Sequence, residues 1–214
     1  MYRQTTLNKP KITAILPHAE NAGLRDLFVD GAFYCTVPAA LLMQQGLGVG
    51  DCFDEQALES LTFAAKLIPA KEKAYQYLEY GDLSRKKLYT KLVQYGIEEP
   101  VAEAACSLME EQGFIDDGRL AESMAHRFAG AKRWGPRHIL PEMVQRGIPP
   151  ELAKEAVAML DWDYTESIRH YLETKYRRAD LSDRKERARV CQGLQRLGFE
   201  FEDINSVIIQ FTEE

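Results

Sequence analysis

Three glycines mark a repeat along the chain, because Gly96, Gly147 and Gly198 are each separated by 51 residues. Apolar residues lie four and eight positions before each glycine, the spacing of one face of an α-helix. These residues are Leu88 and Leu92, Ile139 and Met143, and Val190 and Leu194. Glycine adopts a positive φ without steric penalty, so a glycine directly after such a stripe indicates a helix end. The pattern predicts three helices that end alike.

The residues at the start of these helices also fit. Ser84 is a good N-cap for the first helix, and Gly135 followed by Pro136 gives the second helix a tolerated cap and a proline at its first position. In the third copy a suitable cap occurs only at Ser182 or Asp183. We therefore expect the third helix to begin there.

A second apolar stripe follows each glycine, after a short acidic or proline-containing stretch typical of a helix start. The stripes are Ala102, Ala105, Cys106 and Met109; Ala153, Ala156, Val157 and Leu160; and Ile204, Val207, Ile208 and Phe211. A further helix is predicted ahead of each pair, at about 71–80, 119–131 and 165–178, with Tyr77, Phe128 and Tyr171 on its apolar side. Each repeat is thus three helices, and we interpret the apolar positions as core.

The sequence before the repeats has a different pattern. Two short apolar runs, 27–29 and 32–36, are joined by Asp30-Gly31, which favours a two-residue hairpin turn. Residues 11–16 read as a third strand, 18–23 as a loop, 38–45 as a short helix and 46–51 as a glycine-rich turn. Residues 56–67 read as a separate helix that leads into the repeats, with the extension joined to them near Pro69. The predicted extension is small, α+β and contains a β-hairpin.

The predicted fold is mainly α: three tandem three-helix repeats that form an elongated curved rod behind the N-terminal extension. The expected domains are 1–68 for the extension and 69–117, 118–163 and 164–214 for the repeats. A rod of this kind usually presents its surface to macromolecules.

Composition excludes several classes. The 214 residues are 45% hydrophobic and 28% charged, close to globular averages, and no apolar run approaches the roughly 18 residues needed to span a bilayer. The first eleven residues do not resemble a signal peptide, so we expect a cytoplasmic protein. The four cysteines are widely spaced and predict reduced thiols, not a metal site.

The net charge of −6 conceals two basic segments. The first, 126–146, has five basic and one acidic side chain, with Trp134 among them; the second, 168–196, has nine and four. Either segment as a whole could face phosphate, although a solvated helix face is the better explanation for any single residue. The candidate binding residues are Arg127, Lys132, Arg133, Arg137, Lys175, Arg177, Arg178, Arg184, Lys185, Arg187 and Arg189.

Motifs of catalysis are missing from the sequence: it has no phosphate-binding loop, dinucleotide fingerprint, zinc-protease motif or nucleophile elbow. The pair Asp116-Asp117 is better explained by a helix start, with Asp117 as the N-cap. We expect no enzyme, no cofactor, no metal and no small-molecule substrate.

Four segments in order resemble the RecX family, the bacterial regulators of the RecA recombinase. They are LSRKKLYTKLVQYGI (83–97), GFIDDGRLAESMAHRF (113–128), WGPRHILPEMVQRGI (134–148) and RKERARVCQGLQRLGFEFEDINSVI (184–208). The resemblance covers about 71–211, and the N-terminal part is similar to the extension of longer members. Three positions depart from the family pattern: Lys87 replaces an acid, Pro141 should interrupt its helix, and Met143 replaces leucine.

The resemblance implies a non-enzymatic modulator that lies in the groove of the RecA filament on single-stranded DNA, and we expect it to be a monomer. It would lower ATP hydrolysis and strand exchange, and so act in DNA repair, homologous recombination and the SOS response. DNA would be contacted within the filament.

Two other functions stay open. A direct DNA-binding protein would use the repeats as helix-turn-helix-like modules, although the net charge of −6 disfavours strong binding to free DNA. A helical scaffold for an unrelated partner is the second.

Overall fold

The computed structural model describes residues 9–213, which form three strands and ten helices. The chain divides into two compact units. The first contains the described residues up to Tyr80 together with Lys91–Met109, and the second contains Gly81–Thr90 and the chain from Glu110 onward.

The N-terminal strands form one antiparallel sheet in the order β1 (Ile12–Pro17), β2 (Leu24–Val29) and β3 (Ala32–Pro38). Asp30 and Gly31 join β2 to β3 and both have a positive φ, of 50° and 85°. This is the backbone that a two-residue hairpin requires, so the predicted hairpin is confirmed.

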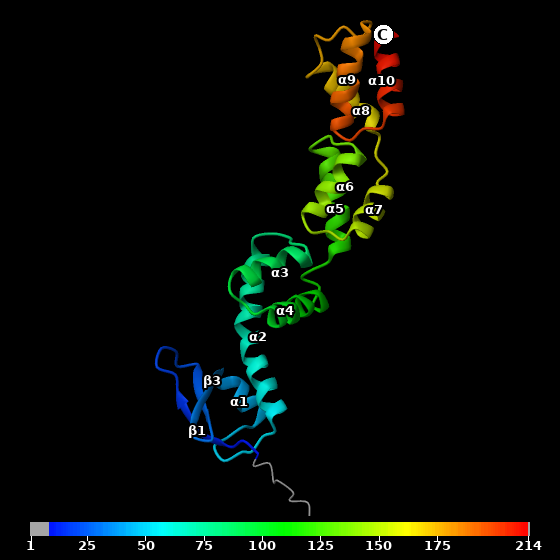
Figure 1. Cartoon of the computed structure of the whole chain (residues 1–214). Coiled ribbons are helices and arrows are strands. Elements are labelled where there is room, and N and C mark those ends of the chain that lie inside the picture. Colours follow the sequence, from blue (N-terminus) through cyan, green and yellow to red (C-terminus); the bar gives the residue numbers. More distant parts are fainter. Residues whose placement is uncertain (1–8, 214) are drawn as a thin grey trace, which may run out of the picture. The chain divides into compact units, whose positions relative to one another are not determined.

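One face of the sheet packs against two helices, α1 (Ala39–Gln45) and the first half of α2 (Glu55–Glu79), as Figure 1 shows. The buried residues of this core are Ile12, Leu27, Val29, Val37, Leu42, Leu58, Leu61 and Ala65. The side chain of Asp54 begins α2 by accepting a hydrogen bond from Ala57 N–H, 2.7 Å away. The three strands, α1 and the first half of α2 thus form one small α+β module around a shared core.

Helix α2 continues through Pro69, and the helix end predicted there is wrong. A proline inside a helix removes one hydrogen bond and costs about 3 kcal/mol. Packing on both sides offsets that cost: Ala65 belongs to the core under the sheet, and Ala70 and Ala74 are also buried. The domain boundary expected after residue 68 falls inside this helix.

The next two helices are α3 (Arg85–Gln94) and α4 (Glu99–Glu111). The predicted stripe of α4 is buried at all four positions. Ser84 caps α3 as predicted, because its hydroxyl oxygen accepts a hydrogen bond from Lys87 N–H. Gly96 follows α3 with φ of 102°, which confirms the predicted helix end.

A second core joins α5 (Asp117–Gly130), α6 (Pro136–Gln145) and α7 (Pro150–Ala158). Its buried residues include the predicted Phe128, Ile139, Met143, Ala153 and Ala156. Helix α6 runs through Pro141, so the predicted interruption is wrong. The Pro141 ring lies on the exposed face, while Ile139 and Met143 on the other face are fully buried and hold the helix in place.

The last core joins α8 (Tyr164–Glu173), α9 (Arg184–Arg196) and α10 (Phe201–Glu213). Asp183 caps α9, because its carboxylate accepts a hydrogen bond from Glu186 N–H. Asp183 was one of the two predicted starts of this helix. Helix α8 ends at Glu173 and not near 178 as predicted. Tyr176 N–H donates to Tyr171 O there, a wider turn than the α-helical one, and the chain leaves the helix.

The N-cap of α5 is Asp116, not Asp117 as predicted. Asp116 Oδ1 accepts from Arg119 N–H, at 2.9 Å. Asp117 is the first helical residue, and its carboxylate accepts a hydrogen bond from the first residue of α3. Two adjacent carboxylates therefore cap two different helices.

The 51-residue period is repeated in two tertiary junctions within the second unit. At the first, the Ser84 hydroxyl donates to Arg146 O and lies against Gly147 so closely that a Cβ on this glycine would collide with it. At the second, Gly135 lies against Gly198 in the same manner, and Gly135 N–H donates to Leu197 O. The cap position of one repeat thus packs on the glycine turn of the next.

Within the described residues, no helix is long and apolar enough to cross a membrane. The elongated shape expected from the repeats stays a prediction.

Candidate functional site

The first basic segment surrounds the turn between α5 and α6. Arg127 lies in the last turn of α5, Lys132 and Arg133 lie in the turn, and Arg137 lies in the first turn of α6. Arg133 is half-buried and has φ of 52°, in the left-handed region, whereas the other three side chains are exposed. The turn therefore presents cations on a backbone with a fixed conformation.

Trp134 holds this turn from inside. Its ring packs on Phe128, with centroids 5.2 Å apart, and on His138, at 4.5 Å. Its backbone N–H donates to Phe128 O at 3.0 Å. Trp134 is thus a packing residue between the cations and not a free surface for base stacking.

Arg137 is already engaged within the chain. Its Nε donates to Glu200 Oε1 at 2.6 Å, and its backbone N–H donates to Gly198 O at 3.1 Å. This pair lies at the second repeat junction. Less of the Arg137 charge is left for an external partner than for Arg127 or Lys132.

The second basic segment covers the turns after α8 and the exposed side of α9. Arg187 is half-buried and donates to Asn205 Oδ1 at 2.6 Å. The other six candidate residues of this segment are exposed, and no carboxylate among the described residues forms an ion pair with them. They are Lys175, Arg177, Arg178, Arg184, Lys185 and Arg189.

The structure brings only some of the candidate residues together. Tyr171 in α8 donates its hydroxyl to Lys132 O at 3.2 Å, which joins the first segment to the third repeat. Lys175, Arg178 and Arg189 line one pocket between the turns after α8 and helix α9. Arg184 and Lys185 do not line it.

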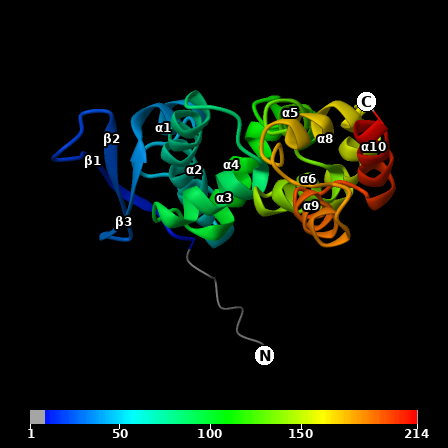
Figure 2. The ribbon, with the colours of Figure 1, turned by 90° about the horizontal axis from the view of Figure 1, so that it is seen from above.

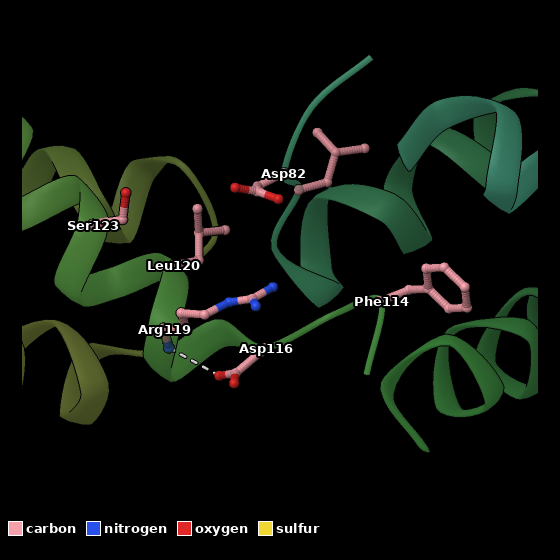
Figure 3. A pocket seen from close by; sticks show the side chains of 7 residues that line it. Asp82, Phe114, Asp116, Arg119, Leu120 and Ser123 are labelled. Atoms are coloured by element: carbon pink, nitrogen blue, oxygen red, sulfur yellow. Dashed lines mark hydrogen bonds between the residues drawn. The ribbon is translucent and has the colours of Figure 1, made fainter. Parts of the chain in front are cut away.

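A second pocket, shown in Figure 3, lies where the segment before α3 meets α5. Its lining residues are Asp82, Leu83, Phe114, Asp116, Arg119, Leu120 and Ser123. The sequence analysis missed this pocket because its residues come from two separated segments. Its volume of about 140 Å³ is small for a ligand, and Asp116 in it caps α5.

The titratable groups show no catalytic arrangement in the part of the chain that the structure describes. No three His, Cys, Asp or Glu residues there could hold a metal ion. Burial raises the pKa of the Cys191 thiol, which favours the neutral and unreactive form. Cys106 is buried as well, so both behave as small core residues.

Three family models match the chain in order: the first three-helix domain of RecX at 70–107, the second at 116–157 and the third at 163–208. Regulatory protein RecX of Vibrio campbellii is 31% identical over 150 residues, which are 70% of this chain and 96% of that protein. Its counterpart in Clostridioides difficile is 26% identical over 199 residues, 92% and 93% of the two chains.

Solved structures agree in fold. A crystal structure of regulatory protein RecX superposes with a TM-score of 0.70 at 23% identity, and it covers 92% of this chain and 98% of the other. RecX from Lactobacillus salivarius superposes at 0.63 and 22% identity, over 71% and 99%. The first matched domain covers the last part of α2 with α3 and α4, and the other two cover α5–α7 and α8–α10. The chain therefore belongs to the RecX family of regulatory proteins.

Proposed function

We propose that this chain is a non-enzymatic regulator that binds in the groove of the RecA filament on single-stranded DNA. It lowers ATP hydrolysis and strand exchange by the filament, and so acts in recombination and the SOS response. The observation that carries the proposal is the ordered match of all three RecX domains. We place the protein in the cytoplasm as a monomer.

The distribution of charge supports a mixed protein and DNA surface. Residues 126–146 carry a net charge of +4 and residues 168–196 of +5, whereas 197–214 contain five acidic and no basic side chains. A filament groove is lined by protein and by DNA phosphate, so basic and acidic surfaces both find complementary partners there.

The candidate residues differ in whether a partner within the chain already engages their side chains, and this ranks them as contacts for the filament. Arg137 and Arg187 are held by Glu200 and Asn205, so their loss would also disturb the fold. Arg127, Lys132, Arg178 and Arg189 are exposed and have more of their charge available. We assign the main contacts with the filament to such exposed residues.

The test is the rate of ATP hydrolysis by the cognate RecA on single-stranded DNA, titrated with the full chain. We expect the rate to fall at concentrations well below that of RecA, because one regulator in the groove affects several protomers. An unchanged rate across the titration would overturn the proposal.

A second candidate is direct DNA binding through the three-helix repeats, favoured by the six cations that lack an ion-pair partner among the described residues. Salt-dependent binding to naked duplex, with no effect on RecA, would be its signature.

A further inference from the structure

The turns after α8 are fastened to α9 at a fixed place. The Tyr176 hydroxyl lies over Gly193, so closely that a Cβ at this position would collide with it. Glycine inside a helix lowers helix stability by roughly 1 kcal/mol relative to alanine, so its presence in α9 calls for a packing reason. Gly193 forms a notch that seats Tyr176.

A second attachment closes the same segment. Glu186 Oε2 accepts a hydrogen bond from Asp180 N–H at 2.6 Å, and Asp180 Oδ1 accepts one from Ser182 N–H at 2.9 Å. Hydrogen bonds from Ser182 also lower the pKa of the Asp180 carboxyl. The carboxylates of Glu186 and Asp180 therefore each accept a hydrogen bond from the backbone of this segment.

These attachments leave a pocket with a basic rim and an apolar floor. The exposed residues Lys175, Arg178, Arg189 and Glu186 line it together with the half-buried Tyr176 and Ala179 and the buried Val190, and we call the three cations its rim and the three less exposed residues its floor. Arg178 and Arg189 have no ion-pair partner among the described residues. The pocket lies between the turns after α8 and helix α9; Figure 2 shows the ribbon of α8, α9 and α10.

We propose that this pocket binds one phosphodiester of single-stranded nucleic acid, with the attached sugar against the Tyr176 ring. The inference rests on the proposed function, because it names the ligand of one part of the same surface. Arginine presents a planar fork of donors that matches the oxygens of phosphate. The volume of about 360 Å³ exceeds what a phosphate group alone would fill and suits a nucleotide unit.

A nucleic-acid phosphate fits this pocket better than an acidic protein surface. The pocket combines three cations with an aromatic ring, the combination that single-strand binding proteins use. A carboxylate partner would leave the apolar floor uncovered, whereas a sugar or base covers it. Lys175 Nζ lies 5.3 Å from the centre of the Tyr176 ring and keeps its charge beside the floor.

The chain offers a matched control for the test. Arg178→Ala with Arg189→Ala removes two charges from the pocket, and Lys87→Ala with Lys154→Ala removes two exposed charges that lie outside both basic segments. Both variants change the net charge equally. Thermal unfolding of each full-length variant confirms that the fold is kept.

Affinity for a fluorescent 20-mer oligothymidylate is measured at several salt concentrations. We expect the pocket variant to bind about ten-fold more weakly, with the slope of log K against log salt reduced by about 1 to 2. The control should lose less than about three-fold. Equal losses in both variants would overturn the pocket, because they would indicate diffuse charge alone.

A second measurement is needed in case the protein binds DNA only weakly when RecA is absent. Amide resonances of 175–193 are followed by NMR while a five-nucleotide oligothymidylate is added to millimolar concentration. Shifts confined to the pocket residues would support the inference. The absence of any shift would overturn it.

The two proposals fail separately. Wild-type protein that binds oligothymidylate through the pocket but leaves RecA unaffected contradicts the filament proposal alone. Wild-type protein that inhibits RecA, with the pocket variant inhibiting equally well, contradicts the pocket alone.

Discussion

Asp117 Oδ1 accepts a hydrogen bond from the backbone N–H of Arg85 at 2.9 Å, although 32 residues separate them. The N–H groups in the first turn of a helix have no partner within the helix. The Asp117 carboxylate on α5 therefore supplies an acceptor for the first N–H group of α3. Its negative charge also interacts favourably with the positive end of the α3 helix dipole.

Replacement of Asp117 should reveal this long-range cap. Asp117→Ala removes the acceptor and should lower the free energy of unfolding by about 1 kcal/mol, whereas Asp117→Asn keeps an oxygen at the same place and should lose less. Urea unfolding measures both. Equal losses would show that the charge, and not the acceptor, matters.

The same residue predicts a pH dependence. Burial raises the pKa of the Asp117 carboxyl above its ordinary value of 3.8, the hydrogen bond from Arg85 opposing the shift. Ionisation of Asp117 is thus harder in the folded than in the unfolded state. Asp117 therefore lowers the free energy of unfolding progressively as the pH rises from 3.8, its ordinary pKa, to its higher pKa in the folded state. The stability of Asp117→Asn relative to wild type should increase from pH 3.5 to pH 7. A difference that stays constant or shrinks would contradict this.

The three turn glycines should differ in their tolerance of alanine. All have a positive φ, but a Cβ on Gly96 would meet nothing within 4 Å, whereas on Gly198 it would collide with the backbone of Gly135 and His138. Gly96→Ala should cost about 1 kcal/mol from backbone strain alone. Gly198→Ala should cost more than about 3 kcal/mol, because the junction must also open. Thermal unfolding compares the two, and similar losses would exclude a tight junction.

The pair Arg137–Glu200 should behave as a local junction contact. Arg137→Glu places two acids together and should lower the free energy of unfolding by about 1 kcal/mol, and the swap Arg137→Glu with Glu200→Arg should restore most of it. The coupling energy comes from a double-mutant cycle. No recovery in the swap would show that the pair contributes nothing.

Charge reversal should weaken binding to the RecA filament. Arg127→Glu with Lys132→Glu, or Arg178→Glu with Arg189→Glu, should raise the Kd at least about ten-fold, because attraction turns into repulsion. Fluorescence anisotropy of labelled protein on preformed filaments measures this.

The control for charge reversal is Lys87→Glu with Lys154→Glu, which changes two exposed lysines outside the basic segments. It should leave the Kd within about three-fold. If all three variants bind like wild type and remain folded, the basic segments are not the contact surface.

Local signals predicted most of the fold. The Gly96, Gly147 and Gly198 series identified three helix ends, and the Asp30-Gly31 pair identified the hairpin, because each depends on neighbouring residues alone. Pro69 misled the prediction, since local propensity opposes a helix that tertiary packing maintains. The roles of Asp116 and Asp117 could not be separated, because the partner of Asp117 lies 32 residues away.

For the candidate site, the sequence predicted only where basic side chains gather along the chain. The sequence indicated two basic segments, but not that Glu200 engages Arg137 or that Asn205 engages Arg187. It also gave no sign that Tyr176 folds back onto Gly193 and shapes a pocket. Such contacts join residues at separations that no periodicity encodes.

The unbroken helix α2 constrains how this chain can change its length in evolution. Each residue inserted into a helix turns everything beyond it by about 100° and advances it by about 1.5 Å. A single insertion between Ala65 and Ala74 would therefore rotate the buried side of one half of α2 away from that of the other half. Insertions and deletions among relatives should accumulate in the turns between α8 and α9, and α2 should keep a constant number of residues.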